Sequence, residues 1–111
     1  MTLLLPLRLP SAANLREHWA TKAKRVKAQR QMVAAYFGGR LLPALPVVVT
    51  LTRIAPRTLD SDNAQMAMKA VRDEVAHRFG VPDNDPRIRW EYGQRKGGVG
   101  EYAVLIVVGA V

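Results

Sequence analysis

A run of β-branched residues bounded by prolines, PVVVTLTRI at residues 46–54, most strongly constrains the fold of this 111-residue chain. Such a run favours a strand, because β-branched side chains pack well on a pleated sheet. A second, half-buried strand is predicted over residues 3–9, because one face would carry only leucine (Leu3, Leu5, Leu7 and Leu9) and the other would carry Leu4, Pro6 and Arg8. Pro6 cannot donate a ladder hydrogen bond, so this strand is expected at a sheet edge or to begin late.

A helix is predicted between these strands, over residues 21–37, and Gly38-Gly39 ends it. Its expected core face consists of Ala23, Val26, Val33 and Phe37. A second helix begins where Asp60 or Asp62 can cap it and runs to about Phe79.

Two more strands are predicted over residues 87–92 and 100–108, joined as a hairpin by the Gly-rich, basic GQRKGGVG. The predicted order is β-α-β-α-β-β, which is an α+β fold with a sheet flanked by helices. The length fits one domain over residues 1–111. The absence of cysteine excludes disulfide scaffolds, zinc ribbons and cysteine nucleophiles.

The formal net charge of +8 is unevenly distributed along the chain. Residues 1–59 carry ten Lys and Arg against one acidic residue, whereas residues 60–85 carry three against six. The basic part predicts a polyanionic partner, most often nucleic acid. A protein that only coats DNA gains nothing from an acidic block, because carboxylates repel phosphates. A protein that holds a metal ion against a phosphate needs one.

The acidic block has a definite pattern. Asp60 and Asp62 stand two residues apart where the chain leaves a strand and enters a helix, a junction at which both can converge on one point. Helical spacing predicts Asp62, Lys69 and Asp73 on one side of the second helix. Asp83 and Asp85 follow in a turn-rich loop. Carboxylates with a nearby lysine suit Mg²⁺-assisted phosphodiester hydrolysis.

Simpler interpretations of the same residues stay open. Asp60 and Asp62 can serve as helix caps, Lys69 and Asp73 as a surface ion pair, and Asp83 and Asp85 as turn residues.

Three segments resemble the RusA family of Holliday-junction resolvases, especially its phage and prophage branch. They are Leu59-Asp60-Ser61-Asp62-Asn63, Met68-Lys69-Ala70-Val71-Arg72-Asp73 and Gly80-Val81-Pro82-Asp83-Asn84-Asp85. Leu9-Pro10-Ser11 with Asn14, and Lys96-Gly97-Gly98 before the final strand, agree in order. One spacing differs: in the best-known member the lysine follows the motif asparagine by three positions, whereas Lys69 follows Asn63 by six.

The resemblance implies a Mg²⁺-dependent endodeoxyribonuclease that works as a homodimer and cuts four-way DNA junctions with paired nicks. Mn²⁺ is expected to substitute for Mg²⁺. By the resemblance, Asp60, Asp62 and Asp85 are catalytic and hold the metal, Asp83 is a neighbouring metal ligand, and Lys69 offsets charge on the phosphate. Whether Asp83 or Asp85 is the principal ligand of the second cluster stays open.

Cationic side chains on the first helix and in the late Gly-rich segment are predicted to contact DNA phosphates. They are Lys22, Lys24, Arg25, Lys27, Arg30, Arg95 and Lys96. Trp19, Tyr36 and Phe37 are expected in the core, although Trp19 with His18 could instead stack on an unpaired base. Trp90 and Tyr92 share one strand face and are expected in the core or a dimer interface.

Two other function classes compete with the resolvase. One is a non-catalytic DNA-binding protein on the same scaffold, and the other is a nuclease acting on different branched DNA. No membrane segment is predicted, because the opening apolar run is too short to span a bilayer. We therefore expect a cytoplasmic location.

Overall fold

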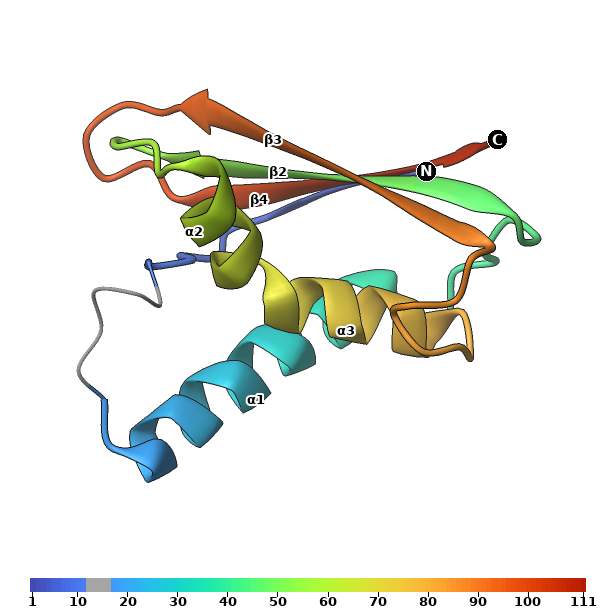
Figure 1. The fold of residues 1–111 in the computed structure, drawn as a ribbon, viewed down its shortest axis with the longest axis horizontal. Helices are drawn as coiled ribbons and strands as arrows, with labels where there is room; N and C mark the ends of the chain where they lie inside the picture. The colour runs from blue at the N-terminus through green and yellow to red at the C-terminus, as the bar shows by residue number, and fades with distance from the viewer. Residues whose placement is uncertain (12–16) are drawn as a thin grey trace.

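Four strands form one mixed sheet in the order β1-β4-β2-β3 (Figure 1). The computed structural model describes residues 1–11 and 17–111; Asn14 therefore lies outside the described residues. The strands are β1 (Thr2–Leu5), β2 (Val47–Ala55), β3 (Ile88–Lys96) and β4 (Ala103–Ala110). β2 runs parallel to β3 and antiparallel to β4, and β1 pairs antiparallel with β4. The predicted edge position of the first strand is confirmed.

Three helices cover one face of this sheet (Figure 1). They are α1 (Trp19–Phe37), α2 (Ser61–Ala67) and α3 (Lys69–Arg78). The α+β class and the order β-α-β-α-β-β are confirmed, with the second helical region divided at Met68. Met68 is fully buried, and its N–H is shared between the carbonyls of Ala64 and Gln65. This tightened turn interrupts the helical register on which the predicted stripe of Asp62, Lys69 and Asp73 depends.

The core lies between the helices and the covered sheet face. Alternation places Leu3 and Leu5 of β1 in it, and Leu7 and Leu9 continue the pattern beyond the strand. From α1, Val33 and Phe37 are almost wholly buried, as predicted. Burying a side chain of this size contributes about 1.5–3 kcal/mol, so these positions hold α1 against the sheet.

The predicted hairpin between the last two strands is wrong. β3 reaches Lys96, farther than expected, and β4 then crosses to pair with β2 and β1 instead of β3. Between the parallel strands β2 and β3, the chain makes its crossover through α2 and α3, which is the connection that parallel neighbours require.

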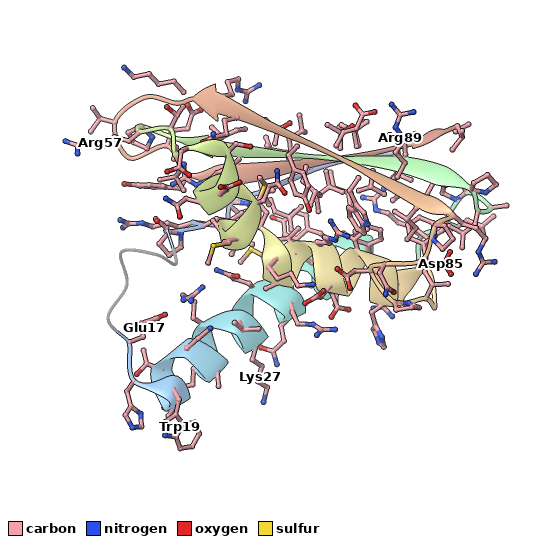
Figure 2. All side chains as sticks on the ribbon, in the orientation of Figure 1. Glu17, Trp19, Lys27, Arg57, Asp85 and Arg89 are labelled. Carbon is pink, nitrogen blue, oxygen red and sulfur yellow. The ribbon has the colours of Figure 1, made fainter. Side chains whose placement is uncertain are left out.

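Three positions predicted to face the core are exposed instead. Trp19 is 76% exposed at the start of α1, and Figure 2 shows it at the end of the helix that projects away from the sheet. Ala23, one turn later, is also exposed, and Tyr36 is 38% exposed. The first turns of α1 extend beyond the sheet, so Trp19 and Ala23 have no core to enter, whereas Tyr36 lies in the last turn, where its neighbour Phe37 takes the core position.

Candidate functional site

The first acidic motif lies where α2 begins. Asp60 is the N-cap of α2, and its two carboxylate oxygens accept hydrogen bonds from the backbone N–H and the side-chain Nδ2 of Asn63, each at 2.9 Å. The capping role is thus confirmed for Asp60. Asp62 is exposed in the first turn of the helix. Neither carboxylate forms an ion pair with a cation among the described residues.

Gln94 of β3 fixes the chain immediately before Asp60. Its Oε1 accepts from the backbone N–H of Leu59 at 2.8 Å, and its Nε2 donates to the Leu59 carbonyl at 2.6 Å. The Gln94 side-chain amide therefore satisfies both backbone polar groups of Leu59, as the backbone of a neighbouring strand would. Because β2 and β3 are parallel, Asp60 emerges at the sheet end where β3 carries Arg95 and Lys96.

Lys69, the first residue of α3, connects two acidic residues. Its Nζ donates to Asp73 Oδ1 at 2.8 Å and to Asp83 Oδ2 at 2.7 Å. The hydrogen bond to Asp73, followed by that to Asp83, raises the pKa of the Lys69 ammonium above its usual range. The lysine is therefore held as a cation at the junction of α2, α3 and the loop that follows α3.

Asp83 is held by a second cation, Arg72. Arg72 Nε donates to Asp83 Oδ2 at 2.9 Å, and its Nη2 donates to the Asp83 carbonyl at 3.1 Å. The same guanidinium donates to Tyr92 Oη at 2.8 Å and lies 4.8 Å from the centre of the Trp90 ring. Trp90 Nε1 also donates to the Asp83 carbonyl. Hydrogen bonding from Lys69, supported by Arg72, keeps the pKa of the Asp83 carboxyl below its usual range.

Asp85 has a separate environment. Arg87 Nε and Nη2 donate to its two carboxylate oxygens at 3.0 and 2.9 Å, which lowers the pKa of Asp85 to about 2. The Ile88 N–H bonds to the Asp85 carbonyl, so Asp85 lies at the start of β3. From Ile88, at the start of β3, to Gln94 the strand rises through six residue steps, roughly 20 Å. Figure 2 shows Asp85 and Arg57 at opposite ends of the sheet.

The structure thus brings together some of the predicted site residues and not others. Lys69 meets Asp83, whereas Asp60 and Asp62 lie at one end of the sheet and Asp85 at the other. Within residues 1–11 and 17–111, no three His, Asp or Glu side chains are grouped so that they could hold a metal ion.

Helix α1 carries five of the predicted DNA-binding cations, and they fall into two classes. Arg25 donates to Glu17 at 2.8 Å, and Arg30 donates to Glu74 of α3 at 2.9 Å. Lys22, Lys24 and Lys27 form no ion pair in the part of the chain that the structure describes. Figure 2 shows Lys27 pointing away from the sheet. These three lysines are therefore the cations of α1 best placed to meet phosphates.

A groove of about 690 Å³ lies between α1 and the α2–α3 segment. Its α1 wall includes Lys22, Val26 and Gln29, and its opposite wall includes Met66, Lys69 and Ala70. Asp73, Asp83 and Tyr92 also line it. The groove therefore adjoins the pair formed by Lys69 and Asp83.

Arg72 and Gln94 organise these loops, but sequence reasoning did not identify them. Their partners Tyr92 and Leu59 lie 20 and 35 residues away. Arg72 lies between Lys69 and Asp73 in the sequence, and this position inside the motif was the one signal that could have marked it as a site residue. Trp90 and Tyr92 are partly buried and pack against the core, as expected, and both are also partners of the Arg72–Asp83 pair.

No family model matches the chain, and no curated protein is significantly similar to it. None of the described helices is both long and apolar enough to cross a membrane.

Proposed function

We propose that this chain is a Mg²⁺-dependent endodeoxyribonuclease of the RusA family that resolves four-way DNA junctions by paired phosphodiester hydrolysis. The observation that carries the proposal is the 2.7 Å hydrogen bond between Lys69 Nζ and Asp83 Oδ2. It joins the lysine that follows the first acidic motif to the second acidic cluster, fourteen residues later. The family resemblance assigns these two parts to one site, and the contact supports that assignment.

Asp60 and Asp62 are the best candidates for holding the metal. Mg²⁺ is usually held by one or two protein carboxylates together with water and substrate phosphate. The two aspartates provide such a pair at one helix start, with no cation partner among the described residues to compete. The resemblance also implies Asp83 and Asp85, but Asp85 lies at the opposite end of the sheet and is paired with Arg87, and Asp83 is paired with Lys69 and Arg72. Mg²⁺, or Mn²⁺ in its place, would polarise the scissile phosphate and activate the attacking water.

The remaining roles belong to cationic side chains. Lys69 offsets negative charge that develops on the phosphate. The lysines of α1, with Arg95 and Lys96 at the carboxyl end of β3, contact phosphates on the arms of the junction. These contacts position the DNA and carry no sequence information.

A homodimer is part of the proposal. Two copies related by a two-fold axis present two sites to a two-fold junction, which explains paired cuts. Leu4 of β1 is 55% exposed on the sheet face that the helices leave uncovered, and this face is a candidate surface for the second copy.

Cleavage of a synthetic four-way junction by the wild type and by Asp62→Asn tests the proposal. Asp62 makes no side-chain hydrogen bond to a described residue, so the substitution is expected to leave folding and junction binding intact while abolishing cleavage. Glu91→Gln, which changes an exposed acid on β3, is the matched control and is expected to cut normally. Flap and plain duplex substrates, tested beside the junction, identify a nuclease for other branched DNA.

A non-catalytic DNA-binding protein is the second candidate function. It is supported by the separation of Asp60 from Asp85 and by the cation partners that Asp83 and Asp85 already have. If the wild type binds junctions but cuts none of several junction sequences with Mg²⁺ or Mn²⁺, this function replaces the nuclease.

A further inference from the structure

We propose that the groove between α1 and the α2–α3 segment binds one unpaired nucleotide of the DNA, with the base inside and the phosphate at the mouth. This inference rests on the proposed function in that it takes DNA as the partner. It adds to that function a site that recognises an unpaired base. Ordinary duplex DNA does not present such a base, because its bases are paired and stacked inside the helix.

Gln29 is the first argument. It lines the groove and is only 3% exposed, yet its Nε2 has no hydrogen-bond partner among the described residues. Buried polar side-chain groups nearly always have partners, so an unpartnered amide at a groove indicates a missing ligand. Its terminal torsion is broad, so the amide can turn toward a ligand without leaving a favourable rotamer. An amide offers both donors and an acceptor, which match the edge of a nucleobase.

The apolar part of the lining is the second argument. Val26 of α1 faces Met66 and Ala70 across the groove. Met66 is 55% exposed, an unusual position for a large apolar side chain that no neighbour covers. The flat faces of a base need apolar or aromatic surfaces, and a methionine side chain adapts to them. A volume of about 690 Å³ lies within the usual range for small-ligand sites and accommodates a nucleotide.

The charges around the groove favour a single phosphate. Asp73 and Asp83 line the groove, but Lys69 pairs with both of them and Arg72 pairs with Asp83. On the opposite wall Lys22 forms no ion pair in the described part of the chain. The groove therefore presents one unpaired cation at its α1 side, which suits one phosphate and not a long stretch of backbone.

Fluorescence anisotropy with a labelled single-stranded oligonucleotide, about ten nucleotides long, tests the inference. It is measured in EDTA, so the result does not depend on cleavage. Gln29→Met keeps the side-chain volume and removes the amide; its affinity for the single strand is expected to fall about three- to tenfold. Met66→Ala, at a position that is 55% exposed and is therefore expected to leave folding intact, should lower the same affinity. Gln31→Met on the exposed side of α1 is the matched control and should bind as the wild type does.

Two comparisons decide whether a base is recognised. An abasic strand of equal length is expected to bind the wild type less tightly than the normal strand, and Gln29→Met should remove that difference. Duplex affinity should change less than twofold in both groove variants. Equal binding of abasic and normal strands, or equal losses on single strand and duplex, would overturn the inference. A protein that cuts junctions yet shows no such single-strand effect keeps the proposed function and loses this one.

Discussion

Arg30 of α1 and Glu74 of α3 form an ion pair that fastens the basic helix to the domain. Arg30 Nε lies 2.9 Å from Glu74 Oε1, and the Glu74 side chain is only 9% exposed. Beyond this pair α1 projects toward its exposed start at Trp19, as Figure 2 shows. The pair therefore fastens the basic helix α1, which we propose contacts DNA, to α3.

Removing only the arginine should destabilise the protein. Arg30→Ala leaves Glu74 buried without its partner, and we expect a loss of about 2 kcal/mol in the free energy of unfolding. Urea denaturation measures it. Lys27→Ala, which removes an exposed cation of the same helix, should change stability by less than about 0.5 kcal/mol. If Arg30→Ala is equally neutral, the pair does not hold α1 in place.

The Arg72 fork, meaning the guanidinium with its three hydrogen bonds to Asp83 and Tyr92, should not tolerate replacement by lysine. A lysine at this position cannot donate at once to Asp83 Oδ2, the Asp83 carbonyl and Tyr92 Oη, nor lie flat on Trp90. We expect Arg72→Lys to lower the free energy of unfolding by about 1–3 kcal/mol. Arg78→Lys, at an exposed position on the same helix, is the control in the same denaturation experiment. Equal stability of the two variants would contradict a structural role for the fork.

The Asp85 carboxyl should titrate at unusually low pH. Because hydrogen bonding from Arg87 lowers its pKa from 3.8 to about 2, its contribution to stability is fully present above about pH 4 and is lost as the pH falls toward 2. Carboxyl-carbon NMR of the folded protein measures the midpoint directly. In Arg87→Ala the midpoint should rise toward 3.8, whereas Arg89→Ala should leave it unchanged. A wild-type midpoint near 3.8 would show that the pair does not persist in solution.

Local periodicity was enough to predict most of the fold. Alternating leucines and the β-branched run identified two strands, because each strand buries one face or both against the same core. The hairpin prediction failed because sequence proximity favours pairing of consecutive strands. In the sheet, β4 lies between β1 and β2, and nothing local in GQRKGGVG specifies that the chain crosses over β2.

The candidate site was predictable only where its contacts are local or carried by the motif. The Asp60 cap and the Lys69–Asp73 pair span three and four residues, within reach of helical spacing. The Gln94–Leu59 and Arg72–Tyr92 contacts depend on the crossover that brings β3 beside β2. The partners of Asp83, Lys69 and Arg72, lie 14 and 11 residues away, beyond the reach of helical spacing. The Asp85–Arg87 pair spans only two residues, but turn chemistry alone does not distinguish it from an unpaired turn aspartate.

Mg²⁺ should stabilise the wild-type protein through the first acidic motif. An ion that binds only the folded state raises the free energy of unfolding by RT ln(1 + [L]/Kd), so millimolar Mg²⁺ is expected to raise the melting temperature by a few degrees. Asp62→Asn should remove this shift while melting normally without metal. Glu91→Gln should retain it. An unchanged wild-type melting temperature, with and without the ion, would count against a metal site at Asp60 and Asp62.

The two classes of cation on α1 should differ in their effect on DNA binding. A side chain that contacts a phosphate releases about one counterion, so losing it reduces the slope of log affinity against log salt concentration by about one. Lys24→Ala and Lys27→Ala are expected to show this reduction on a four-way junction, because neither lysine pairs with a described acid. Arg25→Ala should show a smaller one, because Arg25 is already paired with Glu17. Binding titrations in EDTA at several salt concentrations give the slopes. Identical slopes for all three variants would mean that the internal ion pair does not decide which cations meet DNA.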